Sequence, residues 1–183
     1  MSGTADADRY HFADFTRDNY RRLLRLAKER YVFRSFTDFR RDEPFVLWRH
    51  DVDASMQSAL RLARIEAEEG VRATYFVHPH SEFYNLLERS VADCVDAILA
   101  AGHRLGLHFD ATWYGVGTQA DLERRLAEER ALLHAAFGVE VEAFSFHNPD
   151  ATALSFREGS YAGMVNTYAA YFRDEVGYCS DSN

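Results

Sequence analysis

The 183-residue sequence is poor in the residues that hold small secreted domains together. It contains two cysteines, too few for a disulfide framework, and three prolines. Cys94 falls on the apolar face of an expected helix, where a buried reduced thiol is the simplest interpretation. The first eight residues are small, polar and acidic, and they lack the basic and apolar regions of a secretory signal. These features predict a cytoplasmic protein.

Long apolar runs and an excess of positive charge are also missing. No stretch is long and apolar enough to span a membrane. The formal net charge is −8 at pH 7, whereas nucleic acids and acidic lipids bind basic surfaces. The composition therefore argues against both partners and leaves a small molecule or a glycan as the expected one. It does not define an oligomeric state.

What the chain does have is enough apolar material for one packed core. Hydrophobic residues make up 47% of the sequence and aromatic residues 14%, which argues against a disordered chain. The length suits one domain, and no repeat, linker or low-complexity segment divides it. We therefore expect a single domain over residues 1–183, in which residues 1–40 form an N-terminal helical extension.

Apolar runs of strand length alternate with stretches of helical periodicity. Strands are expected over residues 45–50, 73–77, 104–109, 141–146 and 177–180. Helices are expected over 14–30, 56–69, 91–101 and 118–138, and 164–168 is a short helix or strand. This order predicts an α/β protein with a largely parallel sheet, in which chemistry gathers at the carboxyl ends of the strands.

Charged side chains follow the first expected strand directly. Because side chains alternate in an extended segment, Arg49, Asp51 and Asp53 share one side, and the residues between them face the other. Two carboxylates and a guanidinium at a strand end can hold a metal ion and provide a catalytic base, whose negative charge the guanidinium balances. A surface salt-bridge cluster, or an aspartate that caps the next helix, is the alternative.

Histidines stand at two other strand ends. His108 and Asp110 share a face after the third strand, and an imidazole with a carboxylate suits zinc and other first-row metal ions. His147 ends the fourth strand and is a ligand, a proton donor or a residue of the rim. His78 and His80 follow the second strand, where they contact substrate or are two solvated side chains of a loop.

Taken together, these motifs resemble the polysaccharide deacetylase family, the NodB homology domain that is also called carbohydrate esterase family four. The resemblance runs from about residue 45 to residue 181. It is carried by the Asp51-x-Asp53 pair, by the second strand at 73–77, and by Gly102-His103-Arg104-Leu105-Gly106-Leu107-His108. The last segment matches the approach to the family's His-x-x-x-His metal motif, with His108 as its first histidine.

The resemblance implies a fold, a reaction and a metal. The fold is an irregular (β/α) barrel of the NodB type, incomplete at its C-terminal end if the chain stops before the last strand. The reaction is a metal-dependent hydrolysis that removes an acetyl group from a sugar or glycan precursor, with a divalent ion, zinc first, as cofactor. Asp51 corresponds to the catalytic base, Asp53 and His108 to metal ligands, and Arg49 would hold the base.

The sequence departs from the family where the second histidine of the motif would stand, because Thr112 occupies that position. Asp110 or His147 must then supply the third ligand, and we favour His147. No histidine follows His147, so it is also the candidate catalytic acid. These departures keep two alternatives open. One is a hydrolase of non-peptide C–N bonds in a small amide or ureide, and the other is a catalytically inactive sugar-binding domain.

Overall fold

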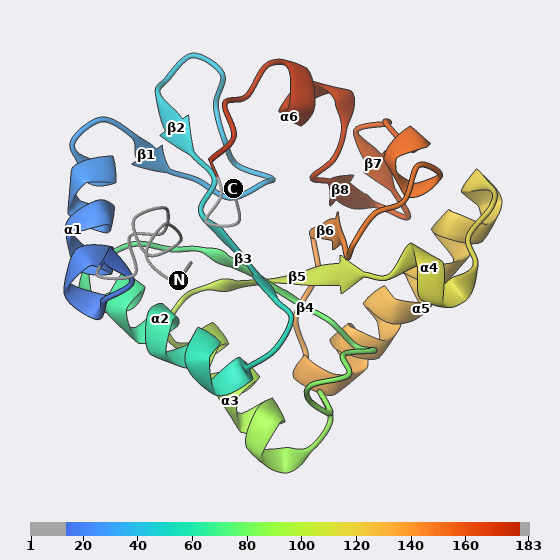
Figure 1. Ribbon diagram of the computed structural model, residues 1–183, viewed down its shortest axis with the longest axis horizontal. Helices are drawn as coiled ribbons and strands as arrows, with labels where there is room; N and C mark the ends of the chain where they lie inside the picture. The colour runs from blue at the N-terminus through green and yellow to red at the C-terminus, as the bar shows by residue number, and fades with distance from the viewer. Residues whose placement is uncertain (1–13, 180–183) are drawn as a thin grey trace, which may run out of the picture.

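The computed structural model describes residues 14–179 and is built around one six-stranded sheet (Figure 1). The strands lie in the order β3 (Arg49–Val52), β4 (Thr74–Val77), β5 (Arg104–Phe109), β6 (Ala143–Phe146), β8 (Met164–Asn166) and β7 (Ser160–Tyr161). Every neighbouring pair is parallel except β7 and β8, which are antiparallel. The α/β class with a largely parallel sheet is therefore confirmed.

The sheet is open at its edges. Within residues 14–179, β3 and β7 are the two edge strands, so these residues do not close the barrel expected from the sequence. Arg49 on β3 nevertheless reaches the segment after β8, where its Nη1 atom lies 3.0 Å from the hydroxyl oxygen of Thr167. The expected strand at 177–180 is wrong over residues 177–179, which have no regular structure, and Ser180 lies outside the described residues.

Helices join the strands much as the periodicity predicts. They are α1 (Arg17–Lys28), α2 (Met56–Glu68), α3 (Arg89–Ala100), α4 (Ala111–Tyr114), α5 (Gln119–Phe137) and α6 (Ala170–Asp174), with a 3₁₀ turn over Ala153–Ser155. Ser55 and Thr118 cap α2 and α5 through their hydroxyls, and Gly138 ends α5 in the left-handed conformation. The N-terminal extension contains α1 and strand β1 (Val32–Phe33), which pairs with β2 (Phe45–Val46); residues 1–13 of that extension lie outside the described part.

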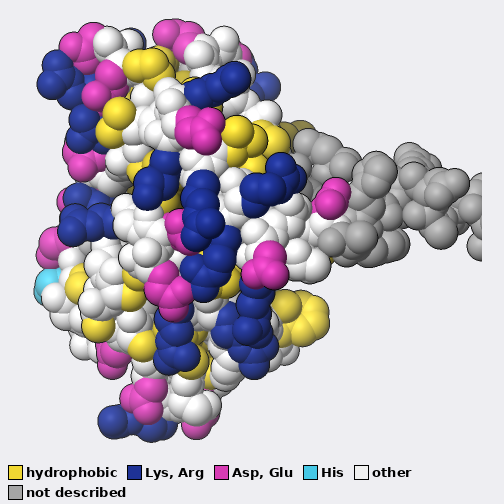
Figure 2. Space-filling view, turned by 90° about the vertical axis from the view of Figure 1, so that its left-hand side faces the viewer, with side chains coloured by type: hydrophobic (Ala, Val, Ile, Leu, Met, Phe, Trp, Pro, Cys, Tyr) yellow, Lys and Arg dark blue, Asp and Glu magenta, His cyan; other side chains and the backbone are white. Residues whose placement is uncertain are grey.

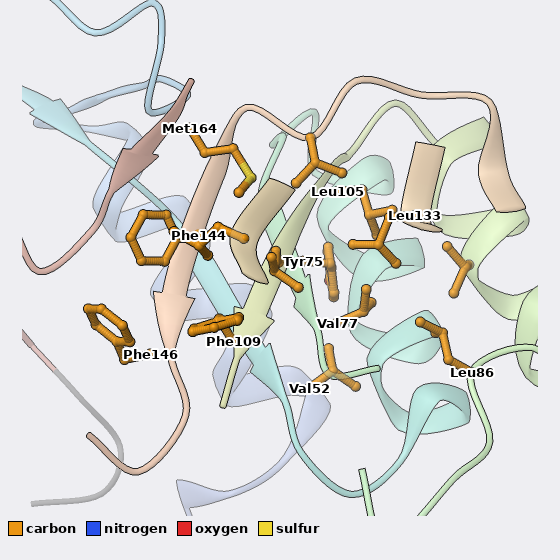
Figure 3. Packing of buried hydrophobic residues seen from close by; sticks show 14 of the residues in the cluster. Val52, Tyr75, Val77, Leu86, Leu105, Phe109, Leu133, Phe144, Phe146 and Met164 are labelled. Atoms are coloured by element: carbon orange, nitrogen blue, oxygen red, sulfur yellow. The ribbon is translucent and has the colours of Figure 1, made fainter. Parts of the chain in front are cut away.

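The main core lies between the sheet and helices α2, α3 and α5 (Figure 3). Alternate residues of the central strands supply one side of it, among them Val52, Tyr75, Val77, Leu107, Phe109, Phe144 and Phe146. Because successive side chains of a strand point to opposite faces, the intervening residues lie on the other face of the sheet. That second face holds the polar residues of interest.

A close contact between β4 and β5 shapes the second face. Phe76 is fully buried there and packs with Phe36 and Ala143. A Cβ atom at Gly106 would lie 2.4 Å from the Phe76 ring, so only glycine fits opposite it. The guanidinium carbon of Arg49 lies 5.0 Å from the centre of the same ring. The aromatic ring thus forms a floor beneath the charged end of β3.

Helix α1 is fixed to the sheet by a buried carboxylate on α2. Glu66 has no exposed surface and accepts hydrogen bonds from the hydroxyls of Tyr20 and Tyr75. Its Oε1 atom also lies 2.5 Å from Nε2 of His50. Burial alone would raise the pKa of Glu66, but His50 and the two hydroxyls together bring that pKa below its usual value. A charged carboxylate therefore joins α1, α2, β3 and β4.

Lysine and arginine side chains gather on the flank of the molecule that carries α1 (Figure 2). Arg21 and Arg25 pair there with Glu68 and Glu69 of the α2 end. Arg25 is exposed, as expected for a solvated basic face. Between residues 14 and 179, no helix combines the length and the apolar character that crossing a membrane requires.

Candidate metal centre and catalytic site

Three predicted residues converge at the carboxyl ends of the strands. Asp53 follows β3, His108 lies in β5, and His147 follows β6. The side chains of His108 and Ser145 are in register across β5 and β6, which brings the ends of these strands to a common height. Asp53, His108 and His147 form one of two groups within residues 14–179 whose atoms lie close enough to hold a metal ion.

The spacing of their ligand atoms is regular. Asp53 Oδ1 lies 3.1 Å from His108 Nε2 and 3.1 Å from His147 Nδ1, and the two nitrogens are 3.1 Å apart. A tetrahedral zinc site with bonds of about 2.0–2.1 Å separates neighbouring ligand atoms by about 3.3–3.4 Å. Calcium, with bonds of about 2.3–2.6 Å and a preference for oxygen ligands, suits this set poorly. Two imidazoles and a carboxylate at this spacing fit zinc or another first-row ion.

The environment favours the ionised state of Asp53. The hydrogen bond from His108 lowers the pKa of the Asp53 carboxyl, burial opposes this, and His147 lowers the pKa further. His108 is buried, and its Nδ1 atom has no hydrogen-bond partner in residues 14–179. The Oδ2 atom of Asp51 is 3.9 Å from that Nδ1, too far for a hydrogen bond, but the negative charge of the carboxylate favours a proton on the nearer nitrogen. A bound metal ion would replace the hydrogen bond between Nε2 and Asp53, and a proton on Nδ1 would then leave the Nε2 lone pair free for the ion.

Asp110 has a contact that its spacing did not suggest. Its Oδ1 atom accepts a hydrogen bond from the Trp113 backbone N–H at 2.9 Å, so Asp110 caps α4. With His78 and His147 it forms the second group of potential ligands. His147 therefore lies between two sets, and its Nδ1 atom is the one that meets Asp53 and His108.

The histidines after β4 are not solvated loop residues, so that interpretation is wrong. His78 is buried and stacks on His147 with ring centroids 4.5 Å apart. Burial, reinforced by His147 and His108, lowers the pKa of His78 to about 4, which keeps it neutral at pH 7. His80 stacks on Trp113. The burial of His78 could not be read from the sequence, because a loop after a strand is usually exposed.

Asp51 lies beside this group in a separate hydrogen-bond network. Its Oδ2 atom accepts from Arg49 Nη2 and, at 3.1 Å, from the hydroxyl of Ser145. Arg49 also donates to Ser145 Oγ at 2.6 Å and to Thr167. The other oxygen of Asp51, Oδ1, is buried without a partner in the described part of the chain. One carboxylate oxygen is thus fixed by two donors, and the other, although buried, is open in the sense that no hydrogen bond from residues 14–179 occupies it.

Several residues in or near the site were not predicted from the sequence. Strand alternation puts Ser145 on the same face as His147, but the sequence assigns no role to Ser145 or to Thr167. Glu129 stands at helical spacing from Leu122, Leu126 and Leu133, and an acid within an apolar stripe is the one pattern that would have identified it. Thr112, where the family places a histidine, is exposed on α4.

Comparison with known proteins adds little. No protein-family model and no curated protein matches the chain. Among solved structures, it is similar to the Xyl-CE4 domain of a multidomain xylanase from the hindgut metagenome of Trinervitermes trinervoides, at 16% identity and a TM-score of 0.42. The match covers 62% of this chain and 56% of that one, so the chain spans little more than half of its length. A likeness this weak carries no argument about function.

Proposed function

We propose that this protein is a metal-dependent hydrolase that removes an acetyl group from a sugar or glycan precursor. One observation carries the proposal: three ligand atoms of Asp53, His108 and His147 lie 3.1 Å from one another, beside the half-satisfied carboxylate of Asp51. The sequence motifs that resemble the polysaccharide deacetylases support the same reaction. The metal, its zinc identity and the acetylated sugar all belong to this proposal.

Asp53, His108 and His147 would hold the metal ion through Oδ1, Nε2 and Nδ1. When bound, a divalent ion supplies a Lewis acid that polarises the acyl carbonyl and makes a nearby water more acidic. His147 was a candidate for both ligand and acid. Because its Nδ1 atom meets the other two ligand atoms, we assign His147 to the metal and not to proton transfer.

Asp51 then moves the proton. Its open Oδ1 atom takes a proton from the attacking water, whose oxygen forms a bond with the acyl carbon. The bond between that carbon and the sugar nitrogen or oxygen breaks, and Asp51 returns the proton to the leaving atom. Acetate and the free amine or hydroxyl of the sugar are the products. Arg49 and Ser145 hold Oδ2 throughout, which orients Oδ1 and balances the charge of the base.

Metal removal followed by assay on two substrate panels tests the proposal. The protein is treated with a chelator, dialysed and supplied with zinc, and is then offered acetylated sugars or small amides and ureides. We expect zinc to restore acetate release from the sugars only. His134→Ala is a suitable control because His134 is an exposed histidine at the end of α5. Turnover of the amides alone would establish the second enzyme class, and absence of zinc binding and of turnover would refute the proposal.

A further inference from the structure

A large aromatic side chain is exposed close to the candidate site. Trp113 on α4 exposes 59% of its surface, although tryptophan is usually largely buried. One face of its ring stacks on the His80 ring, with centroids 3.7 Å apart and an angle of 13° between the planes. Because His80 covers one face, the exposed surface of the indole is concentrated on the rest of the ring.

A buried acid holds this stack in place. Glu129 on α5 is 2% exposed, and its Oε1 atom lies 2.7 Å from His80 Nε2 and accepts the Tyr114 hydroxyl at 2.9 Å. Its Oε2 atom has no hydrogen-bond partner among residues 14–179. Burial raises the pKa of Glu129 to about 7, which shows how poorly a charge is accommodated there. Through its contact with Nε2, Glu129 fixes the His80 ring beneath Trp113.

A series of ring contacts leads from His80 toward the candidate metal ligands. The ring of His80 lies 6.5 Å from that of His78, and His78 stacks on His147 at 4.5 Å. The backbone N–H of Trp113 is also bonded to Asp110, the residue that follows β5. Trp113 is thus fixed at both its backbone and its ring, a few side chains from the group formed by Asp53, His108 and His147.

We infer that Trp113 is a stacking platform for a second sugar ring, adjacent to the one that carries the acetyl group. This inference rests on the proposed function and specifies its substrate as an oligosaccharide. A pyranose ring presents a face of C–H groups that packs on an indole, while its hydroxyls stay in water. The carboxylate of Asp110, which is bonded to the backbone of Trp113, disfavours a phosphorylated ring at the same place. A rigid platform loses little conformational freedom on binding.

Binding of N-acetylglucosamine oligomers of one to four units, measured by calorimetry on the zinc-loaded full chain, tests the inference. The wild-type protein should bind the tetramer more tightly than the monomer. Trp113→Ala should weaken tetramer binding by about tenfold, whereas Trp113→Phe keeps an aromatic face and should lose less. Tyr31→Ala is the matched control, because Tyr31 is 47% exposed and follows α1 closely in the chain. Helix α1 lies on the opposite flank from α4 (Figure 1).

Kinetics and fluorescence separate stacking from a structural role. Trp113→Ala should raise KM for the tetramer with little change in kcat, because the platform contacts only the second ring. The chain has two tryptophans, so a change of emission on sugar binding that disappears in Trp113→Phe identifies Trp113 as the residue in contact. Tetramer binding by Trp113→Ala that equals the wild type would overturn the inference, as would a wild-type protein that binds none of the oligomers.

The two proposals fail in different ways. If the wild type deacetylates the monosaccharide and gains nothing from longer oligomers, the platform is wrong and the proposed function stands. If oligomers bind through Trp113 and no metal ion supports acetate release, the proposed function is wrong and the binding site stands.

Discussion

Asp51→Asn is the substitution that most cleanly separates proton transfer from metal binding. The structure predicts that the variant folds. The amide oxygen can take the place of Oδ2 and accept the hydrogen bonds of Arg49 and Ser145, and the amide nitrogen then replaces the open Oδ1 atom. Asparagine has nearly the shape of aspartate, so no side chain needs to move. What disappears is the unpaired carboxylate oxygen that we propose as the proton acceptor.

The expected magnitudes follow from these contacts. Loss of a general base lowers the rate by roughly 10²–10⁴-fold. The hydrogen bond of Asp51 with Arg49 becomes one between a charged and a neutral group, which costs about 1–2 kcal/mol of the free energy of unfolding. Zinc affinity should be retained, since Asp51 is not among the three converging ligands. The variant should therefore be folded, loaded with metal and nearly inactive.

Three measurements on one preparation check this: the zinc content, the unfolding midpoint in urea and kcat on an acetylated sugar. Asp53→Asn is the matched variant, because the same exchange two residues away should remove zinc as well as activity. Wild-type turnover by Asp51→Asn would refute the assignment of the base. Loss of zinc in Asp51→Asn would instead place Asp51 among the ligands.

Other changes test the surroundings of the site. Ser145→Ala should cost about 1–3 kcal/mol in urea unfolding and lower kcat, because Arg49 and Asp51 each lose a buried hydrogen bond, and an unaltered kcat would contradict this role. Glu66→Ala should cost about 3–5 kcal/mol at pH 7, since it leaves buried polar partners unpaired. The pKa of Glu66 is lowered in the fold, so the difference in free energy of unfolding between this variant and the wild type should shrink as the pH falls below the usual value of 4.5. A difference that stays constant with pH would show that the charge of Glu66 contributes nothing. Gly106→Ala should destabilise by about 1–3 kcal/mol or more through the contact of its Cβ with the floor of the site, and a wild-type midpoint would contradict that contact.

Much of the fold was predictable because periodicity and capping act locally. Ser55 and Thr118 stand at helix starts, Gly138 ends α5, and the apolar runs became β4, β5 and β6 within a few residues. The short elements α4, β1 and β7 were missed, since four residues or fewer carry too little pattern. Closure of the sheet was expected from the resemblance, and no local signal specifies which edge strands meet.

The candidate site was predictable only in part. Strand alternation placed Arg49 and Asp51 together and kept His50 on the opposite face, where it contacts Glu66. Alternation within a strand cannot decide between partners on different strands, so spacing favoured Asp110 as a neighbour of His108. The structure brings His147 to His108 because β5 and β6, which are consecutive in the chain, are also adjacent in the sheet. Consecutive strands are neighbours in many sheets but not in all, so the sequence left this pairing open.

The most direct test of the account is the zinc affinity of the wild type, His147→Ala and Asp110→Ala, measured by competition with a chromophoric chelator. The account predicts about one zinc ion per wild-type chain and the same affinity for Asp110→Ala. His147→Ala should lose more than the roughly 10–100-fold that removal of an outer-shell partner costs, because a direct ligand is gone. Wild-type affinity in His147→Ala together with weak binding by Asp110→Ala would contradict the proposed centre.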